Sequence, residues 1–372
     1  MMNLSAIYHR PESEYAYLYT ASEMRVRIRT ALNDIAKIVV VYGDPYDFSN
    51  GVWQKEADIE MMRGLATETH QYWEAKLQAP HNRLNYGFNI TGLDGEELFF
   101  GDQGFEPLID ETAGSDGLMG SNAYFKMPYF QEIDRFKAPE WVKETIWYQI
   151  FPERFANGDP SNDNEGTLPW DPEAHPTREA FYGGDLRGVI DHLDHLVDLG
   201  INGIYFNPIF EAPTNHKYDT RNYLEIDPHF GTKADFKELV DKAHARGIKV
   251  MLDAVFNHIG DESPEWLDVL ENGENSKYAD WFHIHSWPIT TTPKSEYDDN
   301  SNYETFAFTR HMPKLNTANP EVQDYLLDIS TYWIGEFGRD AWRIDVANEV
   351  DHHFWKRFYK AAAALVADFY II

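Results

Sequence analysis

The sequence predicts an N-terminal all-β sandwich that is followed, from about residue 131, by a parallel β/α domain. Short stretches in which apolar and polar residues alternate, separated by turn residues, fill the first part and are typical of antiparallel strands. Strand-like apolar stretches then alternate with amphipathic helical ones, which is the pattern of a parallel sheet covered by helices. The order of these elements fits either a (β/α)8 barrel or a doubly wound sheet.

The first part contains four stretches that justify the sandwich. Residues 24–29 alternate apolar and cationic side chains, so one face of this strand is buried and the other is wet. Residues 38–42 form a second strand that ends at a Gly-Asp-Pro turn. Residues 84–90 and 97–100 flank the Gly-Leu-Asp-Gly sequence at 92–95, which indicates a β-hairpin. Short strands at this spacing are typical of a sandwich.

The second part is expected to alternate strands and helices throughout. The stretch 248–256 is almost continuously apolar, as expected of a strand that is covered on both faces. Thr232 and Asp235 resemble a capping box, and Asn319 followed by proline also marks a helix start. The expected strands cover residues 146–151, 203–206, 248–256, 341–346 and 369–372, and the expected helices cover 186–197, 232–247, 319–333 and 350–366.

One connection is longer than the others. Residues 257–318 separate the third expected strand from its helix. A connection of this length in a packed domain is usually functional or has structure of its own. We expect a small subdomain that grows from the carboxyl end of the third strand, where barrel enzymes build their sites.

The composition excludes several classes of protein. The chain has 372 residues, and 62 acidic against 32 basic side chains give a formal charge of −30, which repels nucleic acid. Hydrophobic residues make up 43%, which is enough for a packed core and argues against general disorder. No apolar run approaches about 18 residues, so we expect no membrane span. The lack of cysteine and of a visible signal peptide fits a cytoplasmic protein.

Polar residues collect where the expected strands end. Asp253, Asn257 and His258 follow the third strand, and Arg343 and Asp345 lie two residues apart on the fourth, so their side chains share one face. A carboxylate beside an arginine stays ionised at neutral pH, which suits a nucleophile. The alternative is a structural Arg–Asp pair at the end of the strand.

Four segments in this order resemble the α-amylase family of glycoside hydrolases. They are GIYFNPIF at 203–210, DAVFNH at 253–258, MPKLN at 312–316 and GRDAWRIDVANEV at 338–350. Together with the long N-terminal β region, MPKLN resembles the branch of neopullulanase, cyclomaltodextrinase and maltogenic amylase. The resemblance covers most of residues 140–372 and, more loosely, the first 130.

The resemblance implies roles for individual residues. Asp345 matches the catalytic nucleophile, Arg343 the arginine that holds it, and Asp253 a structural carboxylate. A retaining glycosidase attacks with one carboxylate and needs a second carboxyl about 5 Å away as acid and then base. The residues that match sugar-contacting positions of the family are His258, Asn257, Tyr218, Asn348 and Glu349.

A second group of polar residues lies before the first helix of the β/α part. Oxygen ligands of this kind suit Ca²⁺, and the branch that the chain resembles binds calcium at these positions. Ordinary turns are the alternative reading, because the same residue types favour turns without any metal. The expected calcium ligands are Asn157, Asp159, Asn162, Asp163, Gly183 and Asp185.

The resemblance also implies an architecture. We expect a sandwich of starch-binding or dimerisation type at 1–130, then an incomplete (β/α)8 TIM barrel with strands 1–4 and the start of strand 5. The barrel covers 131–256 and 319–372, and 257–318 is the subdomain inserted after strand 3. The family's acid/base glutamate follows strand 5, so we expect the general acid to be absent from this chain and the chain to be inactive.

The expected substrates are α-glucan oligosaccharides, cyclodextrins, pullulan or starch, cleaved at α-1,4 bonds, with α-1,6 bonds as a further candidate. The full-length protein is expected to be a homodimer with no nucleic-acid or membrane partner. The alternative function is a carbohydrate-binding or regulatory fragment without turnover. A doubly wound nucleotide-binding enzyme is disfavoured because the sequence has no phosphate-binding glycine loop.

Overall fold

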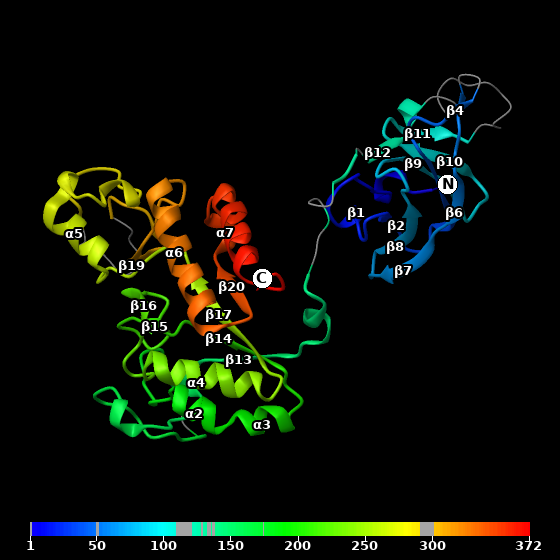
Figure 1. Cartoon of the computed structure of the whole chain (residues 1–372). Helices are drawn as coiled ribbons and strands as arrows, with labels where there is room; N and C mark the ends of the chain where they lie inside the picture. Colours follow the sequence, from blue (N-terminus) through cyan, green and yellow to red (C-terminus); the bar gives the residue numbers. More distant parts are fainter. Residues whose placement is uncertain are drawn as a thin grey trace. The chain divides into compact units, whose positions relative to one another are not determined.

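A computed structural model of the chain describes residues 2–49, 52–108, 121–127, 129–131, 135, 138–173, 175–290 and 301–372. The chain divides into two units between residues 137 and 138 (Figure 1). Each unit has its own core, and they are described separately.

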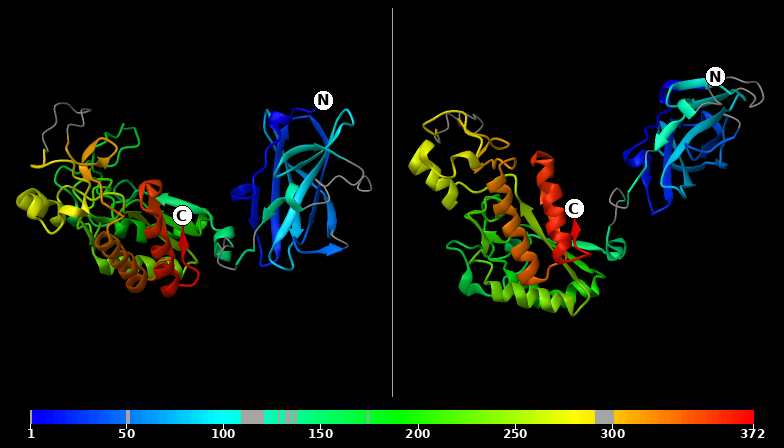
Figure 2. Two further views of the ribbon diagram at one scale, coloured as in Figure 1. Left: turned by 90° about the horizontal axis from the view of Figure 1, so that it is seen from above. Right: turned by 45° about the horizontal axis from the view of Figure 1, so that its top comes forward.

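The N-terminal unit consists of two packed antiparallel sheets, seen as the blue and cyan strands of Figure 2. The first sheet has the order β1-β2-β8-β7, and the second has the order β11-β10-β9-β3-β6, with β12 also paired to β9. The strands are β1 (Ala16–Leu18), β2 (Glu23–Ala31), β3 (Ile35–Gly43), β4 (Phe48–Ser49), β5 (Val52–Trp53), β6 (Ala57–Glu60), β7 (Met62–Ala66), β8 (His70–Gln78), β9 (Leu84–Gly92), β10 (Glu97–Gly101), β11 (Gly104–Pro107) and β12 (Phe125–Met127).

The alternation seen in the sequence places the core between these sheets. Along β2 every second side chain is buried, and Val26 and Ile28 pack in one cluster with Val40 and Phe88 of the other sheet. The predicted hairpin is confirmed, because β9 and β10 pair antiparallel with Thr91 opposite Glu97.

The second unit is built on a five-stranded parallel sheet in the order β13-β14-β17-β20-β21 (Figure 1). All five predicted strands are present, each within a few residues of its expected bounds. They are β13 (Trp147–Ile150), β14 (Gly203–Phe206), β17 (Lys249–Val255), β20 (Ala341–Asp345) and β21 (Tyr370–Ile371).

The helices of this unit begin at the predicted caps. Thr232 and Asp235 form a complete capping box, and the Asn319 side chain accepts a hydrogen bond from the amide of Glu321. The last helix begins later than predicted, because Asp351 caps it through the amides of His353 and Phe354. The helices are α2 (Leu186–Asp191), α3 (Leu193–Asp198), α4 (Lys233–His244), α5 (Pro264–Asn272), α6 (Pro320–Phe337) and α7 (His352–Leu365).

The single helix predicted at 186–197 was wrong in one respect, since the structure divides it at His192 into α2 and α3. The carbonyl of Gly188 would accept the His192 amide in a continuous α-helix. Here that carbonyl is 2.7 Å from Nδ1 of the His192 ring, and the amide donates to Val189 instead. The His192 ring thus takes the carbonyl that its own backbone amide would use in a continuous helix, and the amide forms the tighter bond to Val189 instead.

The two faces of the parallel sheet differ in chemistry. Ile204, Leu252 and Trp342 are buried with apolar side chains of the helices in one core, and α6 and α7 lie side by side in both views of Figure 2. Tyr205 and Arg343, one position away on β14 and β20, are only partly buried, and on β17 the corresponding position holds the buried carboxylate Asp253. The polar face of the sheet therefore points away from the helices, toward the place where a site can form.

Two connections at the carboxyl ends of the strands carry small elements. A hairpin of β15 (Phe210–Glu211) and β16 (Asn222–Ile226) follows β14. After β17, the stretch 257–318 contains α5 and a hairpin of β18 (Thr305–Phe306) and β19 (Thr309–Pro313). The long connection predicted from the sequence thus has secondary structure of its own.

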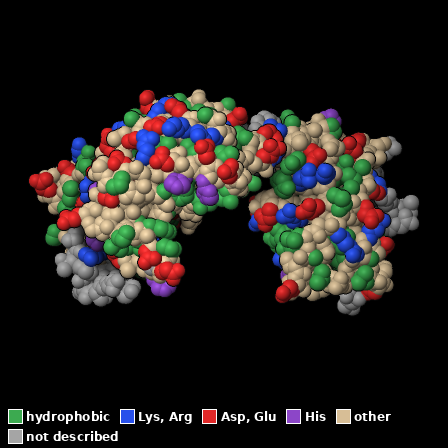
Figure 3. Space-filling model, turned by 90° about the horizontal axis from the view of Figure 1, so that it is seen from below, with side chains coloured by type: hydrophobic (Ala, Val, Ile, Leu, Met, Phe, Trp, Pro, Cys, Tyr) green, Lys and Arg blue, Asp and Glu red, His purple; other side chains and the backbone are tan. Residues whose placement is uncertain are grey.

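Acidic and basic side chains lie among each other on the surface that Figure 3 shows. Arg187 pairs with Asp235 and Glu238, and Lys242 also pairs with Glu238. Within the described ranges, no helix is long and apolar enough to cross a membrane.

Gly188 in α2 supplies a prediction about stability. A Cβ at this position would lie 1.9 Å from the carbonyl oxygen of Ala156, so Gly188→Ala is expected to reduce the free energy of unfolding by about 1–3 kcal/mol. The matched control is Gly335→Ala in α6, where a Cβ meets nothing within 4 Å, and this change should stabilise by about 0.5–1 kcal/mol. Urea denaturation of both variants measures the difference, and equal effects would contradict the close approach.

Candidate active site

The parallel register of β17 and β20 brings three charged side chains together. Asp253 lies opposite Arg343, and Val255 lies opposite Asp345. Nη1 of Arg343 is 3.1 Å from both carboxylate oxygens of Asp253 and 2.6 Å from Oδ1 of Asp345. The arginine therefore joins one carboxylate inside the sheet to a second at its carboxyl end.

Burial divides the roles of the two carboxylates. The side chain of Asp253 is fully buried, whereas that of Asp345 is 14% exposed. Burial raises the pKa of Asp253 to about 6, although a hydrogen bond from Tyr205 and the charge of Arg343 act in the opposite direction. Burial also disfavours the charged arginine, but the two carboxylates outweigh it and raise the pKa of Arg343. Of these two carboxylates, only that of Asp345 has solvent-exposed surface that a substrate could reach.

Two tyrosines complete the surroundings of Asp253. The hydroxyl groups of Tyr205 and Tyr218 both donate to Oδ2 of Asp253, the second over 3.0 Å. Burial, followed by the charge of Asp253, raises the pKa of each tyrosine, so both keep the proton that they donate. The sequence analysis did not identify Tyr205. Its place on the polar face of β14, in register with Met251 two residues before Asp253, was the available signal.

His258 is buried beneath Tyr218 and uncharged. Its Nε2 lies 3.2 Å from the carbonyl oxygen of Tyr218, which requires a hydrogen on that nitrogen, and its Nδ1 lies 3.4 Å from the side-chain amide of Asn257. Burial lowers the pKa of His258 to about 4. The ring also stacks on Phe306 at 4.9 Å, a residue of the inserted hairpin that sequence reasoning did not identify.

The backbone turns sharply immediately after Asp345. Val346 has a φ of 51°, in the left-handed region that β-branched residues avoid. Strain of this kind is concentrated at functional sites, where the surrounding structure enforces it. The turn ends β20 and directs the chain into the short 3-10 helix Ala347–Glu349.

Two of the predicted sugar-contacting residues are exposed, and one of them is linked to this cluster through Lys314, whose backbone forms a β-bridge with His258. Asn348 and Glu349 are exposed on the helix that follows Val346. Oε2 of Glu349 pairs with Nζ of Lys314 at 2.7 Å, which joins two of the sequence segments on which the resemblance rests. The structure thus gathers Asp345, Arg343, Tyr218, His258 and Asn257, and places Asn348 and Glu349 beside them in sequence but on the surface.

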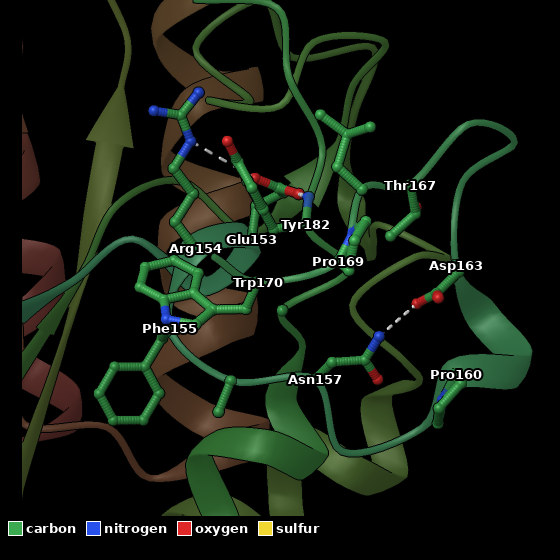
Figure 4. A pocket seen from close by; sticks show the side chains of 13 residues that line it. Glu153, Arg154, Phe155, Asn157, Pro160, Asp163, Thr167, Pro169, Trp170 and Tyr182 are labelled. Atoms are coloured by element: carbon green, nitrogen blue, oxygen red, sulfur yellow. Dashed lines mark hydrogen bonds and ion pairs between the residues drawn. The ribbon is translucent and has the colours of Figure 1, made fainter. Parts of the chain in front are cut away.

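The expected calcium ligands also come together. Figure 4 shows the side chains of Asn157 and Asp163 pointing toward one another, with the Asn157 amide donating to Asp163 over 2.7 Å. They line a pocket of about 460 Å³. Gly183, with a φ of 74°, lies against both, because a Cβ there would be 2.4 Å from Asp163.

Asp185 has a structural role that is independent of any metal. It is fully buried and caps α2, accepting hydrogen bonds from the amides of Gly158, Asp159 and Gly188. The side-chain oxygen of Asn162 is buried without a hydrogen-bond partner. An orphaned oxygen beside carboxylates and a glycine cradle fits a hard cation such as Ca²⁺. Among the described residues, no group of three His, Asp or Glu side chains suffices by itself, so such a site would need amide and backbone oxygens.

A parallel sheet that gathers a carboxylate, an arginine and a histidine at the carboxyl ends of its strands has the arrangement in which α/β proteins build their sites. Residues 149–364 match the catalytic domain of alpha amylase, and residues 1–131 match its N-terminal ig-like domain. The chain belongs to the α-amylase family, as its sequence motifs indicated.

The relatives fall in the predicted branch. Over 372 residues the chain is 52% identical to an intracellular maltogenic amylase of Bacillus subtilis, and over 373 residues it is 49% identical to a cyclomaltodextrinase of Geobacillus thermopakistaniensis. A solved cyclomaltodextrinase superimposes with a TM-score of 0.89 at 46% identity, covering 100% of this chain. The type III pullulan hydrolase of Thermococcus kodakarensis covers 98% with a TM-score of 0.73 at 30% identity. The chain spans 60% of the length of each of these four relatives.

The buried histidine supplies a prediction about pH. Because the pKa of His258 falls from an ordinary 6.5 to about 4 on folding, the unfolded chain binds this proton first as the pH falls. Stability should therefore be lost between pH 6.5 and about 4, by up to about 1.4 kcal/mol per pH unit. His258→Gln removes this contribution. Denaturation at several pH values should show the difference between the two proteins constant above pH 7 and shrinking below 6.5. Parallel curves would contradict a neutral buried His258.

Proposed function

We propose that the protein is a retaining glycoside hydrolase, or the part of one, that acts on α-glucans. One observation carries the proposal: Arg343 donates to Asp345 at the carboxyl end of β20 and to Asp253, which in turn accepts from Tyr218. This arrangement fixes a partly exposed carboxyl group at the position that matches the family's nucleophile. The names of the glycosidase relatives support the substrate class.

In the proposed mechanism, Asp345 attacks the anomeric carbon while the glycosidic bond breaks and the leaving oxygen takes a proton from a general acid. The resulting covalent glycosyl–enzyme intermediate is then hydrolysed by water. Arg343 donates to Oδ1 of Asp345 over 2.6 Å and so fixes the orientation of the carboxylate. The other oxygen of Asp345 accepts no hydrogen bond from the residues that the structure describes, so it is the one placed to attack. Tyr218 would stack on the sugar ring, and His258 with Asn257 would contact its hydroxyl groups.

The mechanism needs a second carboxyl as acid and then base. We assign this role to no residue of the chain. Asp253 is fully buried and already holds Arg343, and Glu349 is paired with Lys314. We propose that Glu349 and Asn348 contact substrate instead. The chain spans 60% of its relatives' length. The proposed hydrolysis is therefore assigned to a protein of the relatives' full length, of which this chain would be a part.

The same proposal extends to architecture and surroundings. The five parallel strands would be the first strands of a (β/α)8 barrel, 257–318 its inserted subdomain, and the sandwich a starch-binding-like or dimerisation domain. We also propose a homodimer in the cytoplasm, the latter supported by the name of the intracellular relative. Cyclodextrins, pullulan, starch and maltooligosaccharides are the candidate substrates, at α-1,4 bonds and, as a further class, α-1,6 bonds.

Calcium is proposed as a structural ion. Asn157, Asn162, Asp163 and Gly183 would hold it together with Asp159 and Asp185. When bound, it would neutralise the carboxylates and fix the loop that follows β13. The proposal is supported by the orphaned oxygen of Asn162 and the contact of Gly183 with Asp163.

The second candidate function is a carbohydrate-binding protein without turnover. It is favoured by the sugar contacts proposed for Tyr218 and His258, since no acid is assigned among the residues that the structure describes. Incubation with a cyclodextrin separates the two readings. Binding without hydrolysis fits a fragment that keeps its sugar contacts. Turnover that disappears in Asp345→Asn would mean that the chain supplies both carboxyls.

Maltotriose binding tests the proposed function. We expect the chain to bind maltotriose in isothermal titration calorimetry and His258→Ala to weaken the affinity at least tenfold, about 1.4 kcal/mol. The matched control is His311→Ala, whose ring is exposed on the inserted hairpin and pairs with Asp261. The control should bind like the wild type. An unchanged affinity in His258→Ala, or no binding by the wild type, would count against the proposal.

Thermal unfolding with and without Ca²⁺ tests the ion site. An ion that binds only the folded chain stabilises it by about 2.7 kcal/mol at one hundred times its dissociation constant. We expect Ca²⁺ to raise the melting temperature of the wild type and to leave Asp163→Ala unchanged. Asp171→Ala, an exposed residue outside the cluster, serves as control and should respond like the wild type. If Ca²⁺ raised the melting temperatures of the wild type and of Asp163→Ala equally, the proposed calcium site would be refuted.

A further inference from the structure

Lys217 is a lysine with almost no exposed surface, in the connection that follows β14. Its side chain is 1% exposed, and its Nζ lies 2.7 Å from Oδ2 of Asp227, whose side chain is 2% exposed. The same Nζ donates to the carbonyl oxygen of Ala212 over 2.9 Å. Burying two charges costs free energy unless pairing and hydrogen bonds offset it, so this geometry is tightly defined.

These contacts join the two ends of residues 212–227, here called the 212–227 loop. Oδ2 of Asp227 accepts from the amide of Ala212 over 3.1 Å as well as from Lys217, and Oδ1 accepts from the amide of His229. Ala212 is therefore held through both its amide and its carbonyl. The lysine side chain thus fastens residues 212–217 to the end of β16.

The backbone at Lys217 is strained. Its φ is 61°, in the left-handed region that residues other than glycine rarely adopt. A non-glycine residue persists there only when its surroundings impose the conformation. The buried ion pair supplies that constraint. The turn at Lys217 then sets the direction of the backbone at the next residue, Tyr218.

Tyr218 connects the 212–227 loop to the candidate active site through both its hydroxyl group and its backbone carbonyl. Its hydroxyl donates to Asp253 over 3.0 Å, and its carbonyl accepts from His258 over 3.2 Å. A change in the course of the chain at Lys217 would therefore move the ring of Tyr218 and the partner of His258 together.

We propose that Lys217, through its ion pair with Asp227, is a positioning residue that fixes Tyr218 and His258 at the sugar-binding subsite. The inference rests on the proposed function of that subsite. Lys217 itself touches no substrate, because its charged end is enclosed by Asp227, Ala212 and the ring of Phe230.

The test uses the double variant Lys217→Met/Asp227→Asn in the full chain. Lys217→Met alone would leave a buried carboxylate without its counter-ion and destabilise the fold. In the double variant no buried charge is left unpaired. The single side-chain oxygen that Asp227→Asn leaves can accept from the amide of Ala212 or from that of His229 but not from both, so the variant loses the lysine bridge and one of these two hydrogen bonds. The matched control is Lys249→Met/Asp340→Asn, which removes a 2.8 Å ion pair at the start of β17.

Three measurements test the inference: thermal unfolding, maltotriose affinity and the position of Tyr218. We expect the double variant to unfold in one cooperative transition, to bind maltotriose at least tenfold more weakly, and to show Tyr218 beyond hydrogen-bonding distance of Asp253 in a crystal structure. The control pair should keep its affinity. Wild-type affinity with Tyr218 in place would overturn the inference. If the wild type itself binds no maltotriose, the proposed function fails, while the position of Tyr218 in the two crystal structures still decides the role of Lys217.

Discussion

The ion-pair chain from Asp253 through Arg343 to Asp345 is the constraint on which the site depends. It requires β17 and β20 to pair in one register, because a slip of one residue would turn every side chain to the opposite face. It also requires partners for a fully buried carboxylate, which Tyr205 and Tyr218 supply. The polar face of the sheet is thus organised by one charge that cannot reach water.

Much of this arrangement could be predicted because its determinants are local. Arg343 and Asp345 are two residues apart on a strand, so a shared face follows from strand geometry alone. Thr232 and Asn319 announce their helices through side chains that cap neighbouring amides. The division of the first helix at His192 was missed, since histidine in an amphipathic pattern does not reveal which carbonyl its ring will take.

The interactions that could not be predicted join residues far apart in the chain. Lys217 and Asp227 resemble surface residues in the sequence. Only the β15–β16 hairpin, whose loop contains Lys217 and whose second strand ends just before Asp227, brings both into the interior. Tyr205 occupies a strand position that sequence periodicity cannot distinguish from ordinary packing. Phe306 reaches His258 from an insertion whose fold no local pattern specified. Burial of polar groups depends on tertiary structure, which composition and spacing do not encode.

The left-handed turn at Val346 has a consequence for how such a chain can change over generations. Asparagine tolerates this conformation far better than valine, so exchanging the residue would relieve strain of about 1–3 kcal/mol. The relieved backbone would also have more freedom next to Asp345. Selection for heat resistance alone would therefore favour the exchange, whereas selection for a rigidly aimed carboxylate would oppose it. At residue 346, higher thermal stability and a fixed orientation of the Asp345 carboxylate therefore favour different amino acids.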